Sequence, residues 1–136
     1  MTSDLVLVDT TIWIHFFRGT DISYRQRLVP LIMTDRAATT PVIVMEILRG
    51  AKSQKEYDNL SKDLAALRSF DLSPKVWERA CKLGYTLRHK GINAPLTDTL
   101  ISAVAQEYNA ILLHDDRHYD MIGSVVHLRL ESLKPV

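Results

Sequence analysis

Leu5-Val6-Leu7-Val8-Asp9 opens the chain with four consecutive apolar residues that end at a carboxylate. An uninterrupted apolar run is typical of a strand buried on both faces, as in a parallel sheet covered by helices. Ile111-Leu112-Leu113 repeats the pattern near the other end of the chain, and Asp115-Asp116 follow it one residue later. The two runs therefore predict two central strands of one sheet.

Between these runs the apolar side chains recur at helical spacing. Helices are predicted from Thr10 to about Gly19, from Ser23 to Met33, from Val42 to about Ala51, and from Ser73-Pro74 to Lys90-Gly91. Another opens at Thr97-Asp98, and a short one lies near Tyr119–Ile122. Further strands are expected at 37–40, 70–72 and 124–128. Strands that alternate with helices predict an α/β fold with a central, mainly parallel sheet flanked by helices.

The bulk composition predicts one ordinary globular domain. The chain has 136 residues, a hydrophobic fraction of 46% and a net charge of +1, so net charge gives no indication of a nucleic-acid partner. A single domain over 1–136 is expected. The apolar runs are too short to span a bilayer and the first residues lack a signal peptide, so we expect a cytoplasmic protein without a membrane partner. The one cysteine, Cys81, is expected to be buried and unreactive.

Several carboxylates are placed where an α/β sheet binds ligands, just beyond the carboxyl ends of its strands. Asp9 and the Asp115-Asp116 pair follow predicted strands, Asp98 opens a helix, and Glu46 lies at the edge of an apolar helical stripe. Carboxylates gathered in one cleft repel each other unless a cation is present, and hard oxygen ligands suit Mg²⁺ or Mn²⁺. Such a site can hydrolyse a phosphodiester bond with a metal-activated water.

Each acid also has a purely structural explanation. Asp9 and Asp98 could be N-caps, Glu46 could pair with Arg49, and Asp115-Asp116 could be turn residues. The functional interpretation depends on the whole set and on its order along the chain.

That set and order resemble the PIN-domain family, particularly the VapC toxins of toxin–antitoxin pairs. Four blocks carry the resemblance, in family order and over nearly the whole chain: Val8-Asp9-Thr10-Thr11-Ile12-Trp13-Ile14, Glu46-Ile47-Leu48-Arg49-Gly50-Ala51, Leu96-Thr97-Asp98-Thr99-Leu100-Ile101-Ser102-Ala103 and Leu112-Leu113-His114-Asp115-Asp116-Arg117-His118-Tyr119. The resemblance implies a PIN-like three-layer sandwich.

By this resemblance, Asp9, Glu46, Asp98 and Asp116 would be the catalytic, metal-binding carboxylates, with Mg²⁺ as the ion and Mn²⁺ as a substitute. Thr10 would orient a water molecule or a carboxylate through its hydroxyl. The fourth block leaves both Asp115 and Asp116 open as its acid. Asp116 is preferred, because Arg117-His118-Tyr119 then match the family's basic, polar and aromatic followers. His114 departs from the usual Thr or Ser and is interpreted as a polar loop residue.

The resemblance further implies an endoribonuclease that hydrolyses RNA phosphodiester bonds, with tRNA or rRNA as the substrate of many relatives. It implies a homodimer and a cognate VapB-type antitoxin that covers the acidic cleft. Thr10, Arg49 and Arg117 would contact substrate. Other cations that could hold phosphate are Arg18, Lys52, Lys55, Arg88 and Lys90.

Three other functions stay open at the level of sequence. One is a PIN-domain nuclease of RNA processing, and the second is an inactive PIN-like interaction module, against which the retention of all four acids argues. The third is a phosphotransfer domain of the receiver or haloacid-dehalogenase type. The dehalogenase type needs a second Asp two residues after the first, where this chain has Thr11.

Overall fold

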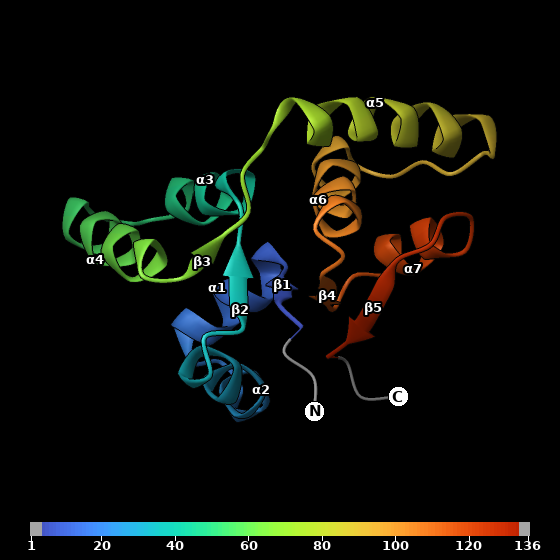
Figure 1. Cartoon of the computed structure of the whole chain (residues 1–136). Coiled ribbons are helices and arrows are strands. Elements are labelled where there is room, and N and C mark those ends of the chain that lie inside the picture. The colour runs from blue at the N-terminus through green and yellow to red at the C-terminus, as the bar shows by residue number, and fades with distance from the viewer. Residues whose placement is uncertain (1–3, 134–136) are drawn as a thin grey trace.

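The computed structural model describes residues 4–133 as a five-stranded sheet in which every neighbouring pair of strands is parallel (Figure 1). The strands lie in the order β3-β2-β1-β4-β5. Their bounds are β1 (Val6–Val8), β2 (Ala37–Thr39), β3 (Arg68–Ser69), β4 (Ile111–His114) and β5 (Arg129–Ser132). The predicted α/β class with a central parallel sheet is confirmed.

Seven helices connect and flank these strands. They are α1 (Thr10–Arg18), α2 (Ile22–Met33), α3 (Pro41–Arg49), α4 (Gln54–Ala65), α5 (Pro74–His89), α6 (Leu96–Glu107) and α7 (Arg117–Gly123). Helix α1 packs against α2 and α3, and α6 packs against α5 and α7. Figure 1 shows α1–α4 mainly on one side of the central strands and α5–α7 mainly on the other, and α3 contacts α6 where the two groups meet. None of the helices within residues 4–133 has the length and apolar character that crossing a membrane requires.

The core is built on β1, whose three residues are completely buried. Val6 pairs with Ala37 of β2 on one side and with Ile111 of β4 on the other, so β1 has a parallel neighbour at each edge. Trp13 of α1 belongs to the same core, is 1% exposed and stacks on Phe17 with ring centroids 5.8 Å apart. The apolar run at 5–8 is thus explained by burial on both faces.

The two edge strands lie elsewhere than predicted. β3 is Arg68–Ser69 rather than 70–72, and β5 is Arg129–Ser132 rather than 124–128. Phe70 follows β3 directly and makes the last hydrogen bond to β2, from its N–H to the carbonyl of Thr39 at 2.8 Å. Its side chain is buried in the core. The residues of β3 are exposed and those of β5 are at most half-buried. Strands at a sheet edge need not be apolar, and the apolar pattern therefore misplaced them.

Cys81 is exposed, contrary to the prediction that it is buried. Helix α5 buries Val76, Leu83 and Leu87. Cys81 lies five residues after Val76, about 140° away around a helix of 3.6 residues per turn, and therefore faces solvent.

The strand order places a topological switch point between β1 and β4. The chain leaves β1 toward β2 on one side, and β4 joins the other side of β1. In open α/β sheets the crevice at such a point, beyond the carboxyl ends of the strands, is the usual ligand site. Asp9 follows β1 there and Asp115-Asp116 follow β4.

Candidate active site

Asp9 is a buried carboxylate at the carboxyl end of β1. It occupies the N-cap position of α1, where the backbone N–H groups of Thr10 and Thr11 also act on its carboxylate. The residue is 5% exposed. Burial raises the pKa of its carboxyl to about 6, against hydrogen bonds from Tyr119 and nearby amides that lower it, and the charge of Glu46 raises it further. The surroundings of Asp9 in the folded protein therefore disfavour its charged form.

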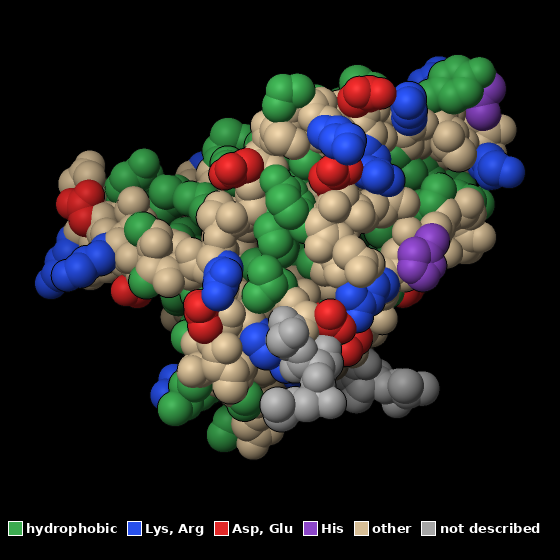
Figure 2. Space-filling model, viewed as in Figure 1, with side chains coloured by type: hydrophobic (Ala, Val, Ile, Leu, Met, Phe, Trp, Pro, Cys, Tyr) green, Lys and Arg blue, Asp and Glu red, His purple; other side chains and the backbone are tan. Residues whose placement is uncertain are grey.

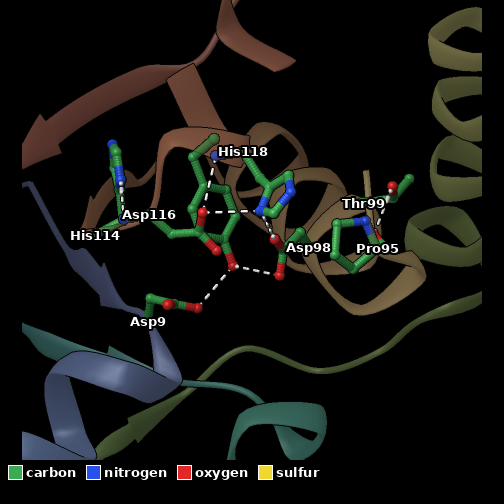
Figure 3. A network of polar contacts seen from close by, with 8 residues as sticks. Asp9, Pro95, Asp98, Thr99, His114, Asp116 and His118 are labelled. Carbon is green, nitrogen blue, oxygen red and sulfur yellow. Dashed lines mark hydrogen bonds and ion pairs between the residues drawn. The ribbon is translucent and has the colours of Figure 1, made fainter. Parts of the chain in front are cut away.

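The hydroxyl of Tyr119 connects two of the acids. It donates to Oδ1 of Asp9 at 2.7 Å and lies 3.4 Å from Oδ1 of Asp98 (Figure 3). Burial and the charges of both carboxylates hold the pKa of Tyr119 well above its ordinary value, so the hydroxyl keeps its proton and acts as a donor. From the sequence, Tyr119 was expected only as the aromatic residue that follows Asp116 in the fourth block.

Asp98 projects into the same space from the first turn of α6. The helix begins at Leu96, one residue before the predicted opening at Thr97-Asp98, and its N-cap is Pro95, so the alternative explanation of Asp98 as an N-cap is wrong. Its Oδ2 is buried and has no hydrogen-bond partner within residues 4–133. Burial, together with the charges of Asp9 and Asp116, raises the pKa of this carboxyl to about 6. An unpartnered buried carboxylate oxygen is a costly group unless a cation or proton occupies it.

Asp116 lies with Asp98, whereas Asp115 points away. One carboxylate oxygen each of Asp98 and Asp116 and a ring nitrogen of His118 lie within 4.8 Å of one another. Asp115 instead accepts the hydroxyl of Tyr24 from α2 at 3.2 Å. Of the two acids left open by the sequence, the fold brings Asp116 into the cluster.

His118 is tied to Asp116 by both its backbone and its ring. The backbone N–H donates to Asp116 Oδ1 at 2.9 Å, and Nδ1 lies 2.9 Å from the same oxygen and 3.8 Å from Asp98 Oδ2. Although partial burial acts to raise it, these hydrogen bonds lower the pKa of Asp116 below its ordinary value. Asp116 also caps α7 through the same backbone contact.

Glu46 reaches the site from α3 and is held by Thr10. The Thr10 hydroxyl donates to Glu46 Oε1 at 2.7 Å. No ion pair joins Glu46 to Arg49 in the described part of the chain, so the alternative explanation of Glu46 as a surface partner of Arg49 is wrong. Arg49 and Arg117 are both exposed, and Arg117 is the first residue of α7.

His114 is the last residue of β4 and is 1% exposed, so its interpretation as a loop residue is wrong. Its Nδ1 accepts the backbone N–H of Asp116 at 3.1 Å, which fixes the turn that carries Asp116. Its ring also packs against Tyr119, with centroids 5.2 Å apart. His114 therefore supports the position of two residues of the site.

The site as a whole is a row of interacting carboxylates. Glu46 raises the pKa of Asp9, and the charges of Asp9 and Asp116 raise the pKa of Asp98. Carboxylate oxygens at the end of a sheet, one of them buried and unpartnered, fit a hard divalent cation such as Mg²⁺ or Mn²⁺. The donor set therefore suits the ion that the sequence analysis implied.

Tyr119 and His118 are the two site residues that sequence reasoning did not assign. They lie two and three residues after Asp116, within the first turn of α7. Their proximity to the last acid was visible in the sequence, but the partner of Tyr119 lies 110 residues away at the end of β1. The pairing of β1 with β4 brings Tyr119 and Asp9 together.

A parallel α/β sheet with an acidic cluster at its switch point places the chain among α/β domains whose acidic site lies beyond the carboxyl ends of the central strands. The profile of the PIN domain family matches residues 6–124, which is most of the chain. The chain belongs to the PIN domain family.

Similar proteins include Ribonuclease VapC11 of Mycobacterium tuberculosis, 26% identical over 140 residues that cover 96% of this chain and 100% of that protein. The fold is similar to a chain of the VapBC2 structure from Rickettsia felis bound to a promoter DNA fragment, with a TM-score of 0.78 and 26% identity over 94% of this chain and 98% of that one. It is also similar to a chain of DNA-bound VapBC from Salmonella typhimurium, with a TM-score of 0.82 and 18% identity over 96% and 98% of the two chains.

Proposed function

We propose that this chain is a divalent-metal-dependent endoribonuclease and the toxin of a toxin–antitoxin pair. The observation that carries the proposal is the contact of three acids from β1, α6 and the β4–α7 turn. Asp9 and Asp98 share the Tyr119 hydroxyl, and Asp98 and Asp116 lie beside His118. The similarity to Ribonuclease VapC11 over its full length supports the ribonuclease activity.

The electrostatics of the cleft make a cation part of the proposal. RNA phosphates are negatively charged, and an uncompensated row of carboxylates repels them. Asp9, Asp98 and Asp116, with Glu46 beside them, are the residues that would hold Mg²⁺ or Mn²⁺. When bound, the ion supplies Lewis-acid activation of the phosphoryl group and of water.

The protein's own side chains provide the positioning. Tyr119 fixes the carboxylate of Asp9, Thr10 fixes that of Glu46, and His118 fixes that of Asp116. Hydrogen bonds of this kind from surrounding residues orient metal-binding carboxylates before the substrate arrives. Arg49 lies three residues after Glu46, and Arg117 directly follows Asp116. Both side chains are exposed and would hold the phosphates of the RNA.

The relatives suggest the partners. Several similar solved structures are VapBC complexes, which supports a VapB-type antitoxin as the partner of this chain. We also propose a homodimer that acts in the cytoplasm. Cleavage of tRNA or rRNA is the expected consequence of its release from the antitoxin.

Asp9→Asn tests the hydrolytic proposal, because it keeps the size of the side chain and removes its charge. We expect cleavage of total RNA by the full chain in Mg²⁺ to fall at least ~100-fold in this variant, with the far-UV circular dichroism unchanged. EDTA should stop the wild-type reaction and Mn²⁺ should restore it. Full activity in excess EDTA would rule out metal-assisted hydrolysis.

Toxicity is tested separately in cells. Induced expression of the wild-type chain should arrest growth, and expression of Asp9→Asn should not. Co-expression of its VapB-type antitoxin should restore growth. Active cleavage in vitro without growth arrest would favour a nuclease of RNA processing instead.

A further inference from the structure

The longest segment of the chain without an acidic residue ends at Asp98 of the candidate active site. It lies between Glu78 and Asp98 and contains four cations, which are Arg79, Lys82, Arg88 and Lys90. Two of them are paired, Arg79 with Glu107 and Lys82 with Glu78. Within residues 4–133, Arg88 and Lys90 take part in no ion pair, so their charges are available to a partner.

An exposed aromatic pair accompanies these two cations at the end of α5. Tyr85 is 66% exposed, and its ring stacks on that of His89 with centroids 3.9 Å apart. The His89 Nδ1 lies 2.9 Å from the carbonyl of Tyr85, which fixes the imidazole ring in the stack. Figure 2 shows Lys and Arg, hydrophobic and histidine side chains together at the upper right, where Figure 1 places this end of α5.

A groove connects this end of α5 with the start of α6. Its volume is about 700 Å³, and it is lined by Leu87, Arg88, Ile92, Asn93, Leu96 and Thr99 together with three small residues. None of the described residues that line it is acidic. Thr99 is next to Asp98, and Figure 3 shows Pro95 and Thr99 on the side of Asp98 away from Asp9. The groove therefore leads away from the acidic cluster.

We propose that the α5 surface, defined as Tyr85, Arg88, His89, Lys90 and the adjoining groove, binds the single-stranded RNA that flanks the scissile bond. This inference rests on the proposed ribonuclease function and adds to it the path of the substrate. Exposed aromatic rings accept stacked bases of any sequence, and unpaired cations bind the backbone phosphates. The acids of the cleft would repel the same strand, so a cationic surface beside them supplies the attraction that the cleft lacks.

Charge favours RNA over a protein as the occupant. Lysine is depleted at the centres of protein–protein interfaces, and Lys90 is exposed close to the aromatic pair with Arg88 as a second unpaired cation. A cationic aromatic surface that continues into a groove without acids is instead the composition of a nucleic-acid channel.

The test measures binding and cleavage separately on the full-length protein. The probe is a fluorescein-labelled 12-nucleotide single-stranded RNA of mixed sequence, measured by anisotropy in EDTA at several salt concentrations. The Arg88→Ala/Lys90→Ala variant should raise Kd roughly 10-fold and make the log–log salt dependence shallower by about 1.4, the loss of two phosphate contacts. Tyr85→Ala should weaken binding roughly 5- to 100-fold, and Tyr85→Phe should bind like wild type.

The matched control is Arg25→Ala/Lys62→Ala, which removes two exposed positive charges from α2 and α4. It should change Kd and the salt dependence less than Arg88→Ala/Lys90→Ala does. In Mg²⁺ the α5 surface variants should raise KM for the same RNA while kcat stays near the wild-type value. Equal effects of the two double variants would overturn the α5 surface.

Two further outcomes are decisive. If the α5 surface variants alter the sedimentation coefficient but leave RNA binding unchanged, the surface is a protein interface and the proposal is wrong. If the wild type cleaves RNA and the variants cleave it with the same KM, only the α5 surface is refuted. If the wild type neither binds nor cleaves RNA, the ribonuclease function and the surface are refuted together.

Discussion

The hydroxyl of Tyr119 donates to Asp9 at 2.7 Å and thereby links the first turn of α7 to the end of β1. Tyr119 is completely buried, so this donor cannot exchange its partner for water. The same hydroxyl lies 3.4 Å from Asp98, which makes it the one neutral group between two acids whose carboxyl pKa values are both raised to about 6. The geometry of the cleft thus depends on a side chain that carries no charge.

Tyr119→Phe should weaken metal binding without unfolding the protein. The change removes the hydroxyl and keeps the ring that packs on His114, so the Asp9 carboxylate loses its fixed orientation. We expect the Kd for Mn²⁺, measured by calorimetry, to rise about 10- to 100-fold. The control is Tyr108→Phe, which removes a hydroxyl that donates to the backbone carbonyl of Asp71 at 2.9 Å. A wild-type Kd in Tyr119→Phe would show that the bridge has no part in holding the ion.

Asp116→Asn and Asp115→Asn should separate the two neighbouring acids. Asp116 contacts His118 and lies near Asp98, so its neutralisation should reduce RNA cleavage at least ~100-fold. Asp115 accepts from Tyr24 outside the cluster, so Asp115→Asn should keep cleavage and lose about 1 kcal/mol of stability. Initial cleavage rates in Mg²⁺ measure the difference. The assignment of Asp116 fails if the two variants lose activity equally.

Thr10→Val should release Glu46 from the hydroxyl that holds it at 2.7 Å. Valine has nearly the same shape as threonine and no hydroxyl, so the expected loss of cleavage is about 10- to 100-fold with the fold preserved. Thr10→Ser retains the hydroxyl and should recover most of the activity. Thr11→Val alters the neighbouring exposed threonine and serves as the control. Equal rates for the valine and serine variants at position 10 would contradict the role of the hydroxyl.

Asp98→Asn should stabilise the metal-free protein in a pH-dependent way. Burial and neighbouring acids raise the pKa of Asp98 from 3.8 to about 6, so the folded state binds its proton more tightly than the unfolded state does. The stability that this proton provides is complete below pH 4 and is lost as the pH rises through 6. Asparagine stays neutral at every pH, so the stability of Asp98→Asn relative to wild type should increase by about 1–3 kcal/mol from pH 4 to pH 7.5.

Urea unfolding in EDTA at the two pH values measures this difference. Saturating Mg²⁺ should remove it at pH 7.5, because the ion stabilises the wild-type folded state and not the variant. If the stability difference between variant and wild type is the same at both pH values, folding does not raise the pKa of Asp98.

The sequence by itself determined the class of fold and the set of acids. Leu5-Val6-Leu7-Val8 and Ile111-Leu112-Leu113 are apolar because a central parallel strand is buried on both faces, and this constraint is visible in the residues themselves. Acids that directly follow such strands lie at the carboxyl edge of the sheet wherever the remaining elements pack. The four sequence blocks added the PIN family, which the profile match to residues 6–124 confirms.

Only the tertiary structure decided how the site is assembled. Edge strands are partly solvated and carry no apolar signature, so β3 and β5 could not be placed from the sequence. The proximity of Asp116 to Asp98, the burial of His114 and the bridge from Tyr119 to Asp9 all depend on side-chain directions at the ends of β1 and β4. Those directions follow from strand register and helix packing, which join residues far apart in the chain and leave no local pattern in the sequence.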